Sequence, residues 1–438
     1  MSTIPRRIAQ TLVNSLKGGV VPRVGLPYVT VGRREEIEAL LHDVDIIAEG
    51  GASFRFISGK YGSGKSFLLQ TIRNHVLAKN FVVLDADLSP ERRLQGSRGQ
   101  GLATYKELIA NMSTKTRPEG GALSLVLDRW INNIQQEAAQ EAGMGVTDPA
   151  VAPLVEKKIA AVMASLKEMV HGFDFARLLT LYYQAHVSGN DETKARVLKW
   201  FRGEYATKTE ARQDLGVNII ITDDDWYDYL KLFSSFFKRA GYAGMLILID
   251  ELVNIYKIPN AITRQYNYEK ILTMYNDTMQ GRAAHMGILL CATPQALEDP
   301  RRGVYSYEAL RSRLAEGRFA GAHKDLLSPV IRLQPLTQEE MLVLVEKLAD
   351  IHAHLYGYAR SIGQDDMVSF IEIEYGRLGA DDHITPREII RDFIEVLDIL
   401  YQNPKIKVAE LLGSGSFTFA KNAVEEAPAA DQFAEFEV

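Results

Sequence analysis

The chain has 438 residues, a formal net charge of −6, 46% hydrophobic residues and 24% charged residues. This composition is typical of a globular protein with two or three domains, and it excludes wholesale disorder. The single cysteine, Cys291, excludes an internal disulfide framework and a cysteine-rich zinc site. No stretch reaches the roughly 18 apolar residues of a membrane helix, so we expect a cytoplasmic protein without a membrane partner.

The beginning of the chain is basic: its first 34 residues carry six basic residues and no acidic one. Ile8, Leu12, Val13 and Leu16 have the spacing of one face of an amphipathic helix. Polar residues between them exclude a secretory signal, and a transit peptide is the alternative to the helix. We predict a basic helix and loop over residues 1–30.

Five short apolar runs predict β-strands, at residues 53–58, 81–87, 244–251, 286–294 and 328–336. Each run is apolar on both sides, as strands of a sheet covered on both faces must be. Helical spacing separates these runs, for example over residues 65–77. Strands that alternate with helices predict an α/β fold with a five-stranded parallel sheet.

Residues 95–240 have helical periodicity and are too many for a loop. We therefore expect a helical insertion here that divides the sheet domain into residues 31–94 and 241–335. Helical spacing predicts a C-terminal lid over residues 336–412. The segment 413–438 begins with small residues and carries five acids and no base from Glu425 onward. It predicts a disordered acidic tail, either inert or able to dock in a basic groove of a partner.

Residues 59–66, GKYGSGKS, fit the pattern GxxxxGK[ST] and lie between a predicted strand and a predicted helix. Glycines let the backbone wrap a phosphate, and the helix N-terminus supplies exposed N–H groups. We expect Lys65 to reach the β- and γ-phosphates of ATP and the Ser66 hydroxyl to bind Mg²⁺. The expected nucleotide-binding residues of this loop are Gly59, Tyr61, Gly62, Ser63, Gly64, Lys65, Ser66 and Phe67.

The third predicted strand, MLILIDE, ends in Asp250 and Glu251, at the same edge of the sheet as the phosphate loop. Asp250 is placed to hold Mg²⁺ through water, and Glu251 to orient and deprotonate the attacking water. The alternative is a pair of solvated acids that close a strand. Thr293 follows the fourth strand, where it can contact the γ-phosphate, cap the helix that Pro294 begins, or do both.

Arginines can complete such a site by neutralising charge on the transferred phosphoryl group, including from a neighbouring subunit. We favour Arg313 for this role, and Arg311 and Arg318 remain alternatives; a surface helix with solvated arginines is the other interpretation. Further along, ITPREIIRDF predicts a capped helix that begins after Thr385 and places Arg387 in its first turn. We expect Arg387 to contact the nucleotide from this lid helix.

Basic and aromatic residues lie close together in the predicted insertion: Lys194, Arg196, Lys199, Trp200, Phe201, Arg202 and Tyr205. They could grip a phosphate backbone and stack a base. The alternative, which we favour, is an amphipathic helix whose aromatic side chains lie in the core. Three acids at residues 223–225 argue against a broad basic face.

The order of phosphate loop, acidic strand end, Thr-tipped strand, arginine helix and helical lid resembles the AAA+ ATPases. VGRREEIEAL, before the first strand, is similar to the box that precedes the AAA+ core in initiator-like members. No NKxD motif occurs, which disfavours a GTPase. The resemblance implies an AAA+ P-loop fold with a helical insertion and a helical lid, with ATP and Mg²⁺ bound between core and lid.

A narrower resemblance is to the BREX-type ATP-binding proteins of bacterial phage-exclusion operons. It rests on the segments GGVVPRVGLPYVTVGRREEI, FRFISGKYGSGKSFLL, LKWFRGEY with ARQDLGV, and RRGVYSYEALRSRL. It implies an ATPase in phage defence that forms a homo-oligomer, works with a helicase-like protein from the same operon and acts on DNA. The alternatives are a slow ATP-gated switch and an adaptor that recruits a partner protein without acting on DNA.

Overall fold

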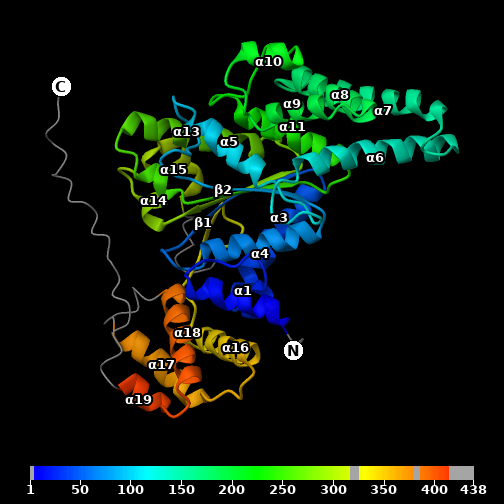
Figure 1. The fold of residues 1–438 in the computed structure, drawn as a ribbon. Helices are drawn as coiled ribbons and strands as arrows, with labels where there is room; N and C mark the ends of the chain where they lie inside the picture. Colours follow the sequence, from blue (N-terminus) through cyan, green and yellow to red (C-terminus); the bar gives the residue numbers. More distant parts are fainter. Residues whose placement is uncertain (1–3, 316–324, 378–384, 414–438) are drawn as a thin grey trace. The chain divides into compact units, whose positions relative to one another are not determined.

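The computed structural model describes residues 4–315, 325–377 and 385–413. The chain divides into two compact units. The sheet unit is Arg33–Pro335, and the terminal unit combines Met1–Gly32 with Leu336–Val438. Figure 1 labels many of the helices of both units and the strands β1 and β2.

The sheet unit contains a five-stranded, all-parallel sheet, as predicted. Its strands are β1 (Ala52–Ser58), β2 (Val82–Asp87), β3 (Met245–Asp250), β4 (Met286–Ala292) and β5 (Val330–Arg332). Their order across the sheet is β2-β3-β4-β1-β5, and every neighbouring pair is parallel. The carboxyl ends of β1, β3 and β4 therefore meet at one edge, where the phosphate loop and the acids Asp250 and Glu251 lie.

Helices cover both faces of this sheet, because successive side chains of each strand point to opposite faces. Phe54 and Phe56 of β1 pack into one apolar cluster and Ile57 into another. The cluster around Ile57 is completed by α3 (Arg34–Ala48) and α4 (Lys65–Ala78). The helices against the other face include α5 (Gln100–Ala110), α11 (Trp226–Arg239) and α13 (Ala261–Met279). Short helices α12 (Val253–Tyr256), α14 (Pro294–Glu298) and α15 (Glu308–Leu314) follow β3 and β4.

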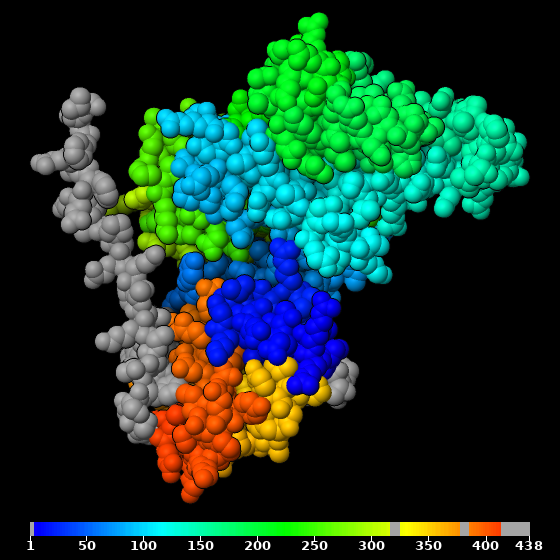
Figure 2. Space-filling view, in the orientation of Figure 1, coloured from blue at the N-terminus to red at the C-terminus, as the bar shows by residue number. Residues whose placement is uncertain are grey.

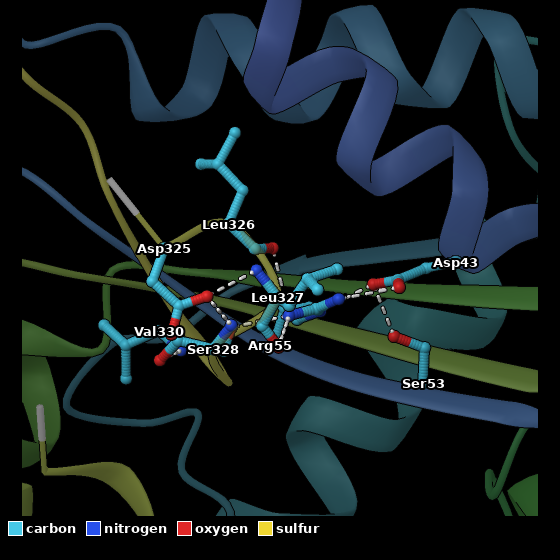
Figure 3. A network of polar contacts seen from close by, with 8 residues as sticks. All are labelled: Asp43, Ser53, Arg55, Asp325, Leu326, Leu327, Ser328 and Val330. Atoms are coloured by element: carbon cyan, nitrogen blue, oxygen red, sulfur yellow. Dashed lines mark hydrogen bonds and ion pairs between the residues drawn. The ribbon is translucent and has the colours of Figure 1, made fainter. Parts of the chain in front are cut away.

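A buried arginine joins α3, β1 and the segment that leads into β5 (Figure 3). Arg55 Nε and Nη2 donate to the two carboxylate oxygens of Asp43, at 2.6 and 2.8 Å. Arg55 Nη1 donates to the backbone oxygens of Leu327 at 2.7 Å and Ser328 at 2.5 Å. Ser53 donates to the same carboxylate at 2.8 Å. Paired and hydrogen-bonded in this way, the guanidinium can be buried inside the fold.

The predicted insertion is helical, and its core is continuous with one face of the sheet. Its further helices are α6 (Leu123–Ala142), α7 (Ala152–Lys167), α8 (Gly172–Ser188), α9 (Asp191–Phe201) and α10 (Lys208–Leu215). They form a lobe of the sheet unit, shown from cyan to green in Figure 2. Asp223 fastens this lobe to α5, since its carboxylate accepts hydrogen bonds from Gly99 N at 2.8 Å and Leu102 N at 2.7 Å. These N–H groups belong to the helix N-terminus, where an acid is stabilising.

The aromatic and basic cluster of the insertion forms part of this core. Trp200 and Phe201 are 1% and 0% exposed, and Lys199 pairs with Glu210. Arg196 pairs with Glu192 one turn earlier on α9, at 2.7 Å. The amphipathic-helix interpretation is confirmed, because buried rings cannot stack on bases.

The terminal unit is helical. It contains α1 (Arg6–Lys17), α2 (Leu26–Val29), α16 (Gln338–Tyr356), α17 (Gln364–Arg377), α18 (Pro386–Gln402) and α19 (Val408–Gly413). The α1 helix packs on α16 and α18, a pairing that the sequence did not predict. Lys17 Nζ and Asp398 Oδ2 form an ion pair between α1 and α18, at 2.5 Å. Among the described residues, no helix combines the length and apolarity that crossing a membrane requires.

Candidate nucleotide site

The phosphate loop connects β1 directly to α4, as predicted. Gly64 precedes the first residue of α4 with φ 93°, and a Cβ there would meet no atom within 4 Å. A Cβ at Gly59 would lie only 2.4 Å from Ser63 Oγ. Glycine is therefore favoured at position 64 by its backbone conformation, whereas a side chain at position 59 would displace the Ser63 hydroxyl. The loop also presents the N-terminus of a 14-residue helix, which favours an anion.

Polar groups within the loop fit a bound triphosphate. Lys65 Nζ donates to the backbone oxygens of Gly59 at 2.8 Å and Lys60 at 2.9 Å, so its ammonium group lies across the loop. Ser63 Oγ is buried and has no hydrogen-bond partner among the described residues. An unsatisfied buried hydroxyl costs about 1–3 kcal/mol, and a phosphate oxygen would satisfy it. Tyr61 is 59% exposed, and Lys65 Nζ lies 5.8 Å from the centroid of its ring.

Ser66 and Asp250 lie in direct contact. Ser66 Oγ donates to Asp250 Oδ2 at 2.6 Å, although 184 positions separate the two residues. A hydroxyl and a carboxylate suit Mg²⁺, which takes few protein ligands and completes its shell with water and phosphate oxygens. In the described parts of the chain, no three His, Cys, Asp or Glu side chains form a metal-binding group. The pair therefore fits a metal that the phosphates help to bind, and it does not form a stand-alone metal centre.

Glu251 follows Asp250 at the end of β3 in an unusual backbone conformation. Its φ is 59°, in the left-handed region that non-glycine residues seldom adopt. Glu251 N donates to Asp250 Oδ1 at 2.7 Å, and Leu252 N donates to the backbone oxygen of Cys291 at 3.2 Å. Such strain costs of order 1–3 kcal/mol and persists only where neighbours enforce it. The conformation turns the chain sharply after Asp250, next to the phosphate loop.

Asp87, at the end of β2, is a site residue that sequence reasoning missed. It is the register partner of Asp250. Burial and the nearby charges of Asp250, Glu251 and Asp85 raise the pKa of Asp87 to about 6. The sequence shows that this strand ends in acids, but only the strand order places that end beside β3.

Arg33 also contacts the phosphate loop, a contact that the motifs did not predict. Arg33 Nη2 donates to the backbone oxygen of Ser63 at 3.1 Å, and Arg33 Nη1 lies 3.7 Å from Glu36. The VGRREE segment that marks the family resemblance contains this arginine. A role in holding the loop could therefore have been inferred.

For the other predicted residues, Thr293, Arg311 and Arg313, the structure shows local contacts within their own helices. Thr293 is the N-cap of α14 and accepts a hydrogen bond from Ala296 N at 3.2 Å, which confirms the capping interpretation. Its contact with a phosphate remains a prediction. Arg311 pairs with Glu308 at 2.6 Å, and Arg313 donates to a backbone oxygen of its own helix, Ala309 O, at 2.7 Å. Arg318 and the acidic tail lie outside the described residues.

Arg387 lies in the first turn of α18, after the capping box formed by Thr385 and Glu388. This local prediction is confirmed. Arg387 is exposed and belongs to the terminal unit. Its contact with the nucleotide remains a prediction.

A separate cavity of about 940 Å³ is remote in sequence from the phosphate loop. Its walls come from four segments: residues 95–106, 204–206 and 220–224 of the insertion, and α13. None of the residues predicted to bind ATP lines it. Two of its charged residues serve the fold: Asp223 accepts from Gly99 N at the N-terminus of α5, and Lys270 Nζ donates to the backbone oxygen of Asp224 at 2.9 Å.

Comparison with known proteins agrees with an ATP-binding protein. No curated protein matches the chain. Residues 4–416 match the sequence profile of a family described as "BREX system ATP-binding protein BrxC/D". The match covers both compact units and the helical insertion. The chain therefore belongs to the BREX system ATP-binding protein BrxC/D family.

Proposed function

We propose that this protein is a Mg²⁺-dependent ATPase of the AAA+ class. The observation that carries the proposal is the hydrogen bond between Ser66 and Asp250, with Glu251 as the next residue. It brings the end of the phosphate loop, a metal-binding hydroxyl and two carboxylates to one edge of the sheet. The strand order β2-β3-β4-β1-β5 supports the AAA+ class, because β4, which Thr293 follows, lies between β1, which leads into the phosphate loop, and β3, which ends at Asp250.

In the proposed mechanism each side chain has one task. Lys65 binds the β- and γ-phosphates, and the loop N–H groups hold the phosphate oxygens. Ser66 and Asp250 would hold Mg²⁺, and the metal would supply positive charge to neutralise the phosphates. Glu251 orients the attacking water and accepts its proton, and Thr293 contacts the γ-phosphate or that water. Arg387 would contact the phosphates.

Assembly into a homo-oligomer would complete the site. Arg313 is exposed on α15 and its side chain makes a hydrogen bond within its own helix. It is therefore available to the nucleotide of a neighbouring copy, where an arginine would stabilise charge in the transition state. The rate of hydrolysis per protein molecule would then rise with protein concentration.

The biological part of the proposal follows from the family. We propose that ATP turnover serves phage defence, with a helicase-like protein from the same operon as partner and DNA as the target. The buried rings of Trp200 and Phe201 exclude the stacking surface considered for α9. A DNA contact would have to use residues other than these two rings.

The test is an ATPase assay of wild type and Glu251→Gln, with and without DNA. We expect the variant to keep ATP binding and lose at least about 100-fold in turnover, since general-base catalysis contributes roughly 10²–10⁴-fold. Glu38→Gln, a change at an exposed surface pair, is the control. Equal turnover by Glu251→Gln and wild type would overturn the mechanism. A wild-type rate near zero at every protein concentration would favour the ATP-gated switch.

A further inference from the structure

The turn that follows Glu251 is held by residues that lie outside the proposed catalytic set. The backbone of Glu251 is strained, and it keeps this conformation only if the segment that follows is also held in place. The direction of the Glu251 side chain therefore depends on that segment. That segment is α12 and the loop to Ile258. Its first turn is tied to the end of β2, the strand beside β3, because Asn254 Nδ2 donates to the backbone oxygen of Leu88 at 2.8 Å.

Arg302 holds the far end of the same segment. Its guanidinium lies 5.4 Å from the ring centroid of Tyr256, the last residue of α12. Its Nη2 donates long hydrogen bonds to the backbone oxygens of Tyr256 at 3.3 Å and Ile258 at 3.5 Å. Carbonyls at a helix C-terminus lack helical partners and favour a cation. The arginine therefore makes both a cation–π contact and a helix-capping contact.

The loop that carries Arg302 is itself fixed to Tyr256. Asp299 Oδ1 accepts from the backbone N–H groups of Arg301 at 2.7 Å and Arg302 at 3.2 Å. Asp299 Oδ2 accepts from the Tyr256 hydroxyl at 3.0 Å. These contacts, above all the Arg301 N–H, keep the pKa of Asp299 below its usual value, so the carboxylate is charged at neutral pH. On the other side, the Tyr268 hydroxyl donates to Arg302 O at 2.6 Å.

We propose that Arg302 is a positioning residue for ATP hydrolysis: with Tyr256 and Asp299 it fixes the turn that aims the Glu251 carboxylate. The proposal rests on the proposed function of Glu251. The same loop continues into α15, which carries Arg311 and Arg313. The network thus connects the turn after Glu251, the proposed general base, with the loop that leads into α15.

The test compares Arg302→Ala with Arg301→Ala, its matched neighbour. Both side chains are exposed. For Arg302→Ala we expect kcat to fall roughly 10- to 100-fold, the effect of displacing a reacting group by about 1 Å, with KM and the Kd for ATP unchanged. Arg301→Ala should behave as wild type. Arg302→Lys keeps a cation over Tyr256 and should recover part of kcat.

Three outcomes would overturn the proposal. One is an unchanged kcat in Arg302→Ala while Glu251→Gln is inactive; full turnover by Glu251→Gln would instead sink the proposed function. The second is a loss of ATP affinity or thermal stability in Arg302→Ala that accounts for the loss of rate, with no recovery in Arg302→Lys. The third is restored turnover when Arg302→Ala and Glu251→Gln are mixed, because that would place Arg302 in a neighbour's site.

Discussion

Ser66 Oγ donates a hydrogen bond to Asp250 Oδ2 at 2.6 Å, which joins the first turn of α4 to the end of β3. Two residues that are far apart in the sequence thereby share one small polar space at the carboxyl edge of the sheet. Within the same space, Glu251 N donates to the other oxygen of Asp250. One carboxylate thus positions both the hydroxyl expected to bind the metal and the backbone of the expected general base.

The first prediction concerns this carboxylate. In Asp250→Asn we expect Mg²⁺ to improve ATP affinity about tenfold less than in wild type, as when an outer-sphere partner of a metal is removed. The measurement is a titration of a fluorescent ATP analogue with and without Mg²⁺. Asp45→Asn, at an exposed surface pair with Lys79, should leave the Mg²⁺ effect intact. An undiminished Mg²⁺ effect in Asp250→Asn would show that this residue does not serve the metal.

The second prediction concerns the buried pair of Arg55 and Asp43. Arg55→Ala leaves the Asp43 carboxylate, on a residue only 5% exposed, without its cation. Removing one partner of such a pair costs about 3–5 kcal/mol, which urea unfolding of the full chain would measure. Arg34→Ala is the control, because the Arg34 side chain in its pair with Glu38 is 87% exposed. That change should cost less than about 1 kcal/mol.

The same measurement has a second arm. Replacing both partners, as Arg55→Met with Asp43→Leu, should recover much of the loss, since no charge remains unpaired. The carbonyls of Leu327 and Ser328 lose their donor in either variant. If Arg55→Ala unfolds at the same urea concentration as wild type, the network in Figure 3 does not stabilise the fold.

The third prediction concerns pH and the buried His352 of α16, which is 1% exposed. Its Nε2 lies 3.1 Å from Asp398 Oδ1, and its Nδ1 lies 2.9 Å from the Tyr358 hydroxyl. Burial lowers the pKa of His352 below 6.5, and Lys17 adds to this, against an opposing contribution from Asp398. The neutral ring is therefore the form that the folded state prefers.

The sign of the effect follows from that preference. The unfolded chain binds a proton at His352 more readily than the folded chain, so the stability that the neutral ring contributes is present above about pH 6.5. It decreases as the pH falls below that value, by at most about 1.4 kcal/mol per pH unit. In His352→Gln this part of the pH dependence should disappear from melting curves between pH 7 and 5. His354→Gln, an exposed histidine on the same helix, should keep it. Identical slopes in all three proteins would contradict the prediction.

The sequence alone determined the local parts of the site. The spacing of Gly59, Gly64, Lys65 and Ser66 predicts a phosphate loop because backbone conformation and helix start depend on neighbouring residues. The strands were also predictable, because a short run that is apolar on both sides is typical of a strand in a sheet covered on both faces. The capping box of Thr385 was likewise predictable, because it depends on only four consecutive residues.

Only the tertiary structure decided which of these local parts meet. The contact of Ser66 with Asp250, the acid Asp87 beside them and the hold of Arg302 on the turn after Glu251 all depend on strand order and on loops between strands. The packing of α1 on α16 and α18 joins the two ends of the described chain in one unit. Such contacts depend on which apolar faces pack together across long sequence separations. The spacing of residues within one segment does not determine which segments pack together.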